Sequence, residues 1–309
     1  MLTTDWRVDR RDFLRVSAAT LVGLAASGVR LHGVGAPRAV GVRFGLIADS
    51  HYADADPKGT RFYRESLGKV REAVTRLRTE RLAFLCELGD LKDMVEGEPD
   101  SRTRAHLAAI DAEVRRFNGP TCHVLGNHDL DNLSKAQFLA GITSTGLAPR
   151  RPYYAFERGG VRFLTLDACV MKGGRDYDHG NFDWRDTILP AVQIEWLRRE
   201  LASSASPAIV FVHQRLDGDG DAFVKNSAEV RAVLEASGKV LAAFHGHDHA
   251  GARSEMNGIH YYTLRAIVEG SGPESNAYAV VEVHRDMRIT VTGYRRAMSA
   301  DMEGRVSRV

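Results

Sequence analysis

Cysteine is scarce in this chain, because only three of its 309 residues are of that type. Cys86, Cys122 and Cys169 all lie in or beside apolar, strand-like runs, and their number is odd. Buried thiols are therefore expected, and a disulfide framework is not. None of the three stands in a Cys-x-x-Cys pair, which argues against a structural zinc site built from thiolates.

Excess charge of either sign is also lacking. The formal net charge is +2, and the first 36 residues account for it, since they hold five of the 42 basic residues and three of the 40 acidic ones. A chain without a basic field is not typical of a non-specific nucleic-acid binder, so a nucleic-acid partner is not expected. The length fits one large α/β domain better than two.

The N-terminus has the layout of a signal peptide. A charged segment, 9–15, contains Arg10-Arg11 followed by Phe-Leu, and a mildly apolar stretch, 16–29, comes next. Small residues at 34–36 offer a cleavage site, and the apolar stretch is too short for a membrane span. The paired arginines resemble the twin-arginine export signal. We therefore expect a leader over 1–36, a domain over 37–309, the twin-arginine export machinery as a partner, and a periplasmic or extracellular location in a bacterium. An amphipathic helix or a disordered tail is the alternative.

After this leader, strand-like and helix-like segments alternate. Apolar runs at 42–48, 83–88, 208–212 and 240–244 are typical of buried strands, and helical spacing of apolar residues separates them. This alternation predicts a parallel-type sheet with helices outside. The tail differs, because 259–264, 278–283 and 287–292 look like successive antiparallel strands. The segment 171–190 is the longest irregular insertion.

Five short polar segments follow these strand-like runs, and together they hold aspartate, histidine and asparagine residues that bind metals in proteins. They are Asp49-Ser50-His51, Gly89-Asp90, Gly126-Asn127-His128-Asp129, Val212-His213 and Gly246-His247-Asp248-His249. Open α/β sheets place ligands at the carboxyl ends of their strands. Taken singly, each segment also fits a turn or a packed core histidine. Only the ordered set predicts a centre of two divalent metals, for which oxygen and imidazole donors favour manganese, iron or zinc.

This ordered set resembles the calcineurin-like metallophosphoesterase superfamily, whose pattern is D-x-H, G-D, G-N-H-[DE], a single His and G-H-x-H. The resemblance covers roughly 42–296. It implies an α/β fold, a four-layer αββα sandwich with two mixed β-sheets and the dinuclear metal site at the C-terminal ends of the strands.

The same resemblance implies roles for individual residues. The first metal would be held by Asp49, His51, Asp90 and His249. Asp90 would bridge to the second metal, which Asn127, His213 and His247 would complete. His128 would protonate the leaving oxygen or stabilise developing charge, with Asp129 orienting it.

A narrower resemblance is to the manganese-dependent ADP-ribose/CDP-alcohol diphosphatases. It rests on 44–49, Ala53-Asp54, Gly59-Thr60-Arg61 and on similar matches at 153–154, 166–168, 193–197 and 246–254. This chain departs from that group at His51, where glutamine is usual, and at Lys92, where an apolar residue is usual. The resemblance implies a small nucleotide-like substrate with a pyrophosphate or diester bond.

Four residues are candidates for substrate contacts. Arg61 and Arg64 could bind a second phosphate, or could lie in a solvated helical turn. In the insertion, His179 could contact substrate, and Phe182 could stack on a base together with Tyr177 and Trp184, or the aromatic residues could pin the loop to the domain.

We therefore predict a dinuclear-metal-dependent hydrolase that uses a metal-bound hydroxide, as a phosphodiesterase or a pyrophosphatase of nucleotide diphosphate conjugates. An exported phosphomonoesterase is the alternative, because the same centre serves both reactions. A non-catalytic protein that binds phosphate ligands is a further alternative, and a pair such as His128 and Asp129 has no use in a pure binder.

Overall fold

A computed structural model describes residues 39–143, 145, 147 and 151–303. The expected leader at 1–36 lies outside these residues. Helices and strands alternate over most of the described chain, as the sequence predicts. Within the described residues, no helix combines the length and apolar character that crossing a membrane requires.

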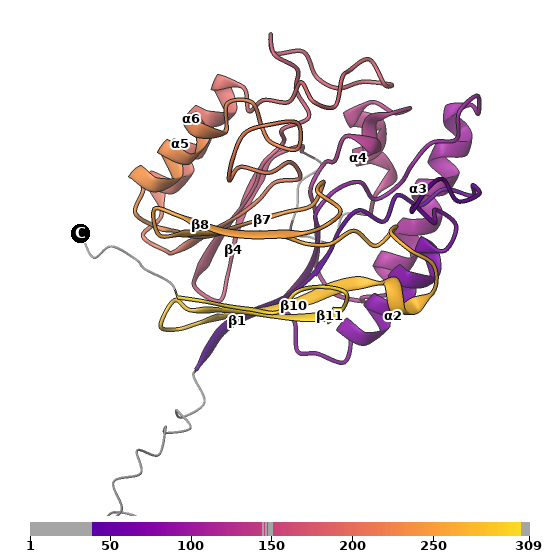
Figure 1. Cartoon of the computed structure of the whole chain (residues 1–309). Helices are drawn as coiled ribbons and strands as arrows, with labels where there is room; N and C mark the ends of the chain where they lie inside the picture. Colours follow the sequence, from indigo (N-terminus) through magenta and orange to yellow (C-terminus); the bar gives the residue numbers. More distant parts are fainter. Residues whose placement is uncertain (1–38, 144, 146, 148–150, 304–309) are drawn as a thin grey trace, which may run out of the picture. The chain divides into compact units, whose positions relative to one another are not determined.

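Within the described residues, twelve strands form two six-stranded sheets, and both sheets mix parallel with antiparallel neighbours. Figure 1 shows the two sheets one above the other. The first sheet has the order β12 (Ala300–Met302), β11 (Ile289–Arg295), β10 (Ala277–His284), β1 (Val40–Ile47), β2 (Phe84–Glu87) and β3 (Thr121–His123). The second has the order β4 (Tyr154–Arg158), β5 (Val161–Thr165), β6 (Ala208–Phe211), β7 (Val240–His245), β9 (Ile259–Thr263) and β8 (Ala252–Met256).

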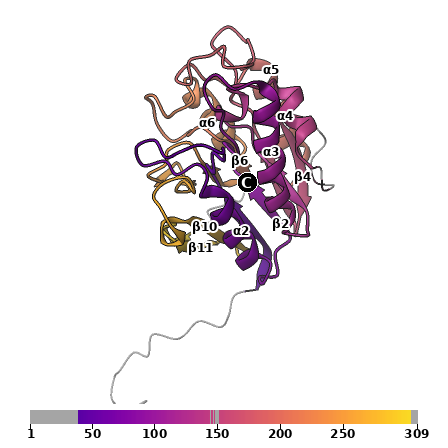
Figure 2. The same ribbon diagram turned by 90° about the vertical axis from the view of Figure 1, so that its right-hand side faces the viewer.

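Helices cover the outer face of each sheet. α2 (Ser66–Leu77), α3 (Asp100–Arg115) and α4 (Lys135–Gly141) lie side by side on the first sheet (Figure 2). α5 (Ala191–Ser203) and α6 (Ser227–Ala236) cover the second sheet. Two short 3-10 helices, η1 (His128–Leu130) and η2 (Pro273–Ser275), complete the elements. The expected four-layer αββα sandwich with two mixed sheets is confirmed.

Three hydrophobic clusters hold the four layers together, and alternation along the strands explains how. In β6, Ile209 and Phe211 belong to the cluster between the sheets, whereas Ala208 and Val210 face α5 and α6. Successive side chains of a strand point to opposite faces, so a strand covered on both sides must be apolar throughout. This is why the strand-like runs in the sequence are nearly continuous.

Phenylalanines fill the space between the sheets. Phe44 of β1 stacks on its parallel neighbour Phe84 with ring centroids 5.0 Å apart, and it meets Phe163 and Phe211 of the other sheet edge to face at 5.5 and 5.6 Å. Such pairs contribute about 0.5–1.5 kcal/mol beyond the area that they bury.

The tail was predicted only in part. β10 and β11 are antiparallel neighbours as expected, but β9 lies in the second sheet, where it runs parallel to β7. The short turn at 257–258 pairs β9 with β8 in an antiparallel hairpin. β8 therefore runs opposite to β7. The hairpin reverses the chain once more, so β9 runs in the same direction as β7 and pairs with it.

Candidate metal centre

The five polar segments meet because neighbouring parallel strands end at one edge of the sandwich. β1, β2 and β3 are parallel neighbours in the first sheet, and β6 and β7 are parallel neighbours in the second. Parallel strands bring their carboxyl ends to the same edge of a sheet. Each segment follows one of these strands directly, so its side chains enter a common site.

One group of ligand atoms comes from Asp49, His51 and His249. The Nε2 atoms of His51 and His249 lie 3.1 Å apart, and Asp49 Oδ1 lies 4.0 and 3.8 Å from them. Two imidazole nitrogens and a carboxylate oxygen at this spacing form a cluster that fits a divalent ion of the manganese, iron or zinc type.

A second group comes from Asp90, His213 and His247, whose ligand atoms also lie within 4.8 Å of one another. The groups share one atom, because Asp90 Oδ2 lies 3.1 Å from His213 Nε2 and 3.4 Å from His51 Nε2. The other oxygen, Oδ1, accepts a hydrogen bond of 2.7 Å from the His128 amide. Asp90 is thus oriented so that a single oxygen faces both groups.

Buried polar atoms without a partner test whether these residues fit metal ions. Several buried side-chain atoms of the described residues have no hydrogen-bond partner, and three of them are Asp49 Oδ2, Asn127 Oδ1 and His213 Nε2. Leaving such an atom unsatisfied costs about 1–3 kcal/mol, and more when the group is charged. All three belong to expected ligands and point to the same site, so the donor set fits a pair of cations.

The local backbone is strained to bring these atoms together. Asp49, His51, Asp90 and His247 all have positive φ, between 44° and 67°, which costs a residue with a side chain about 1–3 kcal/mol. Gly126 leaves room for this approach, because a Cβ atom there would lie 2.2 Å from Asp90 Oδ1. The segments therefore favour the geometry of the site over local stability.

Burial sets the protonation of most of the imidazoles. It lowers the pKa of His51 to about 3, and it holds the pKa of His247 well below the ordinary value. Neutral rings offer a lone pair to a metal. Burial also lowers the pKa of His213, but Asp90 outweighs it and raises that pKa to about 9. His213 Nδ1 donates to the Leu88 carbonyl at 2.8 Å, so Nε2 is the atom that faces Asp90.

His128, like His213, differs from the neutral rings of His51 and His247. Burial alone would lower its pKa, but Asp93 and Asp90, with a hydrogen bond to Asp131, raise the pKa well above 6.5. Its Nδ1 lies 3.2 Å from Asp93 Oδ1 and 3.6 Å from Asp131 Oδ2. A protonated, part-buried ring beside the ligand groups can donate a proton or stabilise negative charge.

The expected contact between Asp129 and the His128 ring differs in the structure. The Asp129 carboxylate is fully buried and accepts hydrogen bonds from the backbone amides of Leu91 and Gly126, both at 2.9 Å, and of Asp90 at 3.1 Å. Asp129 therefore holds two of the polar segments together through their backbone. Asp93, and not Asp129, orients His128.

Asp93 and Glu269 are two supporting carboxylates that sequence reasoning missed. Asp93 contacts both His51 Nδ1 and His128 Nδ1 at 3.2 Å, one with each oxygen. Glu269 lies 2.6 Å from His249 Nδ1. Carboxylates in this position fix the tautomer of a ligating histidine and raise its basicity. The spacing Asp90-x-x-Asp93 is a signal that could have found the first, whereas nothing near Glu269 marks it.

Two adjoining cavities open beside the centre. The smaller, of about 280 Å³, is lined by Asp90, Asn127, His247 and His249 together with Arg61 and Trp184. Arg61 and His128 also line the larger cavity, of about 770 Å³. Of the four candidate substrate residues, Arg61 is therefore the one placed at these cavities, and Trp184, whose ring lies 5.4 Å from His247, joins it.

The other three candidates lie elsewhere among the described residues. Arg64 is paired with Asp54 at 2.6 Å and with Asp56 at 3.0 Å. Phe182 stacks on Tyr177 with ring centroids 3.9 Å apart, so this pair pins the insertion to the core. His179 is exposed beside Asp178 and is not among the described residues that line either cavity.

A family model described as calcineurin-like phosphoesterase matches residues 42–251 of the chain. A manganese-dependent ADP-ribose/CDP-alcohol diphosphatase from Danio rerio is 28% identical over 302 residues, in a match that covers 80% of this chain and 93% of the relative. A protein with the same name from Oryza sativa is also 28% identical and is covered to 90%.

A solved structure confirms the fold. The crystal structure of a dimetal phosphatase from Danio rerio superposes with a TM-score of 0.73 at 24% identity, and the match covers 86% of this chain and all of that one. Both resemblances drawn from the sequence are confirmed by these matches.

Proposed function

Because the chain belongs to the calcineurin-like phosphoesterase family, we propose that it hydrolyses the pyrophosphate bond of nucleotide diphosphate conjugates. The chain is a hydrolase of phosphoester or phosphoanhydride bonds that depends on two divalent metal ions. The preference for pyrophosphate bonds is the finer part of the proposal. It is supported by relatives whose names specify ADP-ribose and CDP-alcohols.

The observation that carries the reaction type is the shared oxygen of Asp90, which faces both ligand groups. Two divalent cations in such a centre bind the phosphate oxygens and lower the pKa of a coordinated water. Asp49, His51, Asp90 and His249 would hold one cation, and Asp90, Asn127, His213 and His247 the other.

The protein supplies the remaining chemistry through His128 and Arg61. Nδ1 of the His128 ring is hydrogen-bonded to the Asp93 carboxylate, so Nε2 is the ring nitrogen that can face the substrate. Because His128 lines both cavities, it is placed to give a proton to the leaving oxygen or to stabilise its negative charge. Arg61 lies at the same boundary and can pair with a phosphate oxygen.

The first experiment is hydrolysis by the purified chain, stripped of metal and then supplied with manganese. The substrates are ADP-ribose, CDP-choline, a chromogenic phosphodiester and a chromogenic phosphomonoester. We expect rapid, manganese-dependent cleavage of the two pyrophosphates.

Other outcomes would identify a different function. A preference for the monoester would make the chain a phosphomonoesterase, and faster cleavage of the diester would make it a phosphodiesterase without pyrophosphate preference. Two bound metals without turnover on any substrate would favour a protein that binds phosphate ligands and would refute the proposal.

We also propose that the enzyme is exported through the twin-arginine route to the periplasm or beyond. The support is the order of Arg10-Arg11, an apolar stretch and small residues at 34–36. The full chain would be expressed in a bacterium that has this route, and the cell fractions compared with those of an Arg10→Lys/Arg11→Lys variant. Export of the parent chain and retention of the variant are expected, and equal location of both would refute the route.

A further inference from the structure

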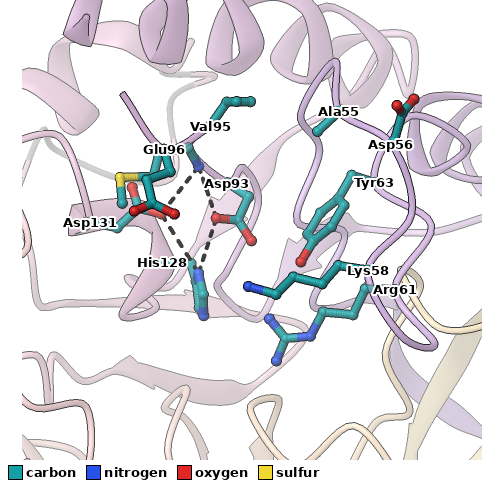
Figure 3. A pocket seen from close by; sticks show the side chains of 11 residues that line it. Ala55, Asp56, Lys58, Arg61, Tyr63, Asp93, Val95, Glu96, His128 and Asp131 are labelled. Atoms are coloured by element: carbon teal, nitrogen blue, oxygen red, sulfur yellow. Dashed lines mark hydrogen bonds and ion pairs between the residues drawn. The ribbon is translucent and has the colours of Figure 1, made fainter. Parts of the chain in front are cut away.

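The larger cavity carries an inference about the group that leaves during hydrolysis. It adjoins the smaller cavity at Arg61 and His128, which line both. Lys58, Arg61 and Tyr63 form one wall, while Val95 and Glu96 lie with His128 on the other (Figure 3). A substrate whose scissile phosphate lies at the metal ligands must therefore pass His128 to place its leaving group in the larger cavity.

A tight turn brings two cations together on the first wall. The backbone amides of Lys58 and Arg61 each donate to the other residue's carbonyl at 3.1 Å, and Gly59 has a φ of 61°. Residues that exchange both hydrogen bonds lie directly opposite each other, so their side chains share one side of the turn. Two positive charges directly opposite each other repel and destabilise the turn. An anion bound between Lys58 and Arg61 would remove this repulsion.

Within the part of the chain that the structure describes, neither cation forms an ion pair with a carboxylate, although the charge of Arg61 also acts on Glu269. Arg64, only three residues further, is held by Asp54 and Asp56. Glu269 pairs with Arg61 through the backbone, but its carboxylate lies 2.6 Å from His249 Nδ1. Lys58 and Arg61 face the cavity and point across it toward His128 (Figure 3).

We propose that Lys58 and Arg61 bind a phosphate group of the leaving group, so that this cavity selects substrates with two linked phosphates. This inference rests on the proposed function and deepens it. In the reaction, the bond from the attacked phosphorus to the bridging oxygen breaks, and a bond from that phosphorus to the oxygen of water forms. The water gives up a proton to solvent, and His128 gives a proton to the bridging oxygen. The bridging oxygen departs with the second phosphate, as a phosphate monoester that Lys58 and Arg61 hold.

Charge-neutral variants of the two cations test the proposal. The measured quantity is the ratio of kcat/KM for ADP-ribose to kcat/KM for bis(p-nitrophenyl) phosphate, which has a single phosphate. Loss of one charge-assisted hydrogen bond should lower this ratio about tenfold in Lys58→Gln, and loss of both about 100-fold in Lys58→Gln/Arg61→Gln. Arg64→Gln is the matched control and should keep the ratio of the parent chain.

Lys58 is the more decisive position, because it lines only the larger cavity, whereas Arg61 also reaches the smaller one. Elemental analysis and the denaturation midpoint would show that each variant binds two metals and folds. A Lys58→Gln variant that is folded, fully metallated and unchanged in the ratio would overturn the inference, as would equal losses on both substrates. Failure of the proposed function is distinguishable, because the parent chain itself would then show no preference for ADP-ribose.

Discussion

The metal centre and the larger cavity beside it are built in different ways. The expected ligands Asp49, His51, Asp90 and His213 are buried side chains that directly follow strands, and their supporting hydrogen bonds span both sheets. The cavity is lined mainly by exposed or half-buried residues of two loops, 55–63 and 94–96, which the buried Asp93 and the half-buried His128 and Asp131 complete. Strand ends therefore fix where the expected ligands lie, while the loops form the cavity that we propose selects the substrate.

The largest expected effect comes from Asp90→Asn, since Asp90 alone contributes an oxygen to both ligand groups. Replacing the carboxylate by an amide should reduce the metal content below two ions per chain. We expect kcat/KM to fall about 1,000-fold or more, which corresponds to about 4 kcal/mol of transition-state stabilisation. Elemental analysis and steady-state kinetics provide the check, and an unchanged metal content would refute the shared position of Asp90.

His128→Ala separates metal binding from catalysis within the centre. The ring contacts Asp93 and lies outside the two ligand groups that share Asp90, so both metals should remain bound. Loss of a proton donor should lower kcat by about 10²–10⁴-fold. Equal turnover by the variant, with full metal content, would remove His128 from the mechanism.

Glu269→Gln tests whether the support of the ligands reaches into the loops. The carboxylate of Glu269 orients His249 through Nδ1, and an amide keeps the shape but loses the charge. Outer carboxylates of this kind are worth about 10–100-fold in metal affinity, so we expect manganese to bind about tenfold more weakly. Titration of the metal-stripped protein with manganese measures this. If the variant binds manganese as tightly as the parent chain does, Glu269 does not support the centre, and only the residues at the strand ends do.

This division also explains what the sequence could predict. Each ligand follows an apolar run, and both the run and the residue type are visible in the sequence, so all seven expected ligands were placed at one site. Asp93 and Glu269 act through contacts with histidines 42 and 20 residues away in the sequence, and only Asp93 has a local signal, its spacing from Asp90. Similarly, β9 looked like a member of the tail sheet, because residue types do not record which sheet a strand joins.

Asp217→Asn tests a charged cluster next to the centre through the pH dependence of stability. Arg215 joins Asp217 to Asp248, which lies between His247 and His249. Burial alone would raise the pKa of Asp217, but hydrogen bonds from Arg215 and Ser254 and the nearby charges of His245 and Arg215 together outweigh burial and lower the pKa to about 2. Because the folded-state pKa is below the unfolded value, this stabilisation is present above about pH 4 and is lost as the pH falls through 2.

In numbers, the shift corresponds to about 2 kcal/mol of unfolding free energy near pH 7. Urea denaturation of the metal-stripped parent chain and of Asp217→Asn should differ by this amount at pH 7, and the difference should shrink as the pH falls from about 4 toward 2. A difference that is constant over this pH range would show that the carboxylate's charge contributes nothing.

The smallest expected effects are those of Trp184→Ala and Phe182→Ala on KM and on stability. The sequence alone could not tell which of these two aromatic residues of the insertion contacts the substrate. Trp184 lines the smaller cavity with 38% of its surface exposed, whereas Phe182 is stacked on Tyr177. Stacking on a base is worth about 1–3 kcal/mol, and at the lower end of this range Trp184→Ala should raise KM for ADP-ribose about fivefold and leave the denaturation midpoint unchanged. Phe182→Ala should do the reverse, because it removes packing from the core and leaves the cavity wall in place. Phe182→Ala could instead raise KM as much as Trp184→Ala does, with no loss of stability. That result would show that both aromatic residues act on the substrate and that Phe182 does not serve to hold the insertion on the core.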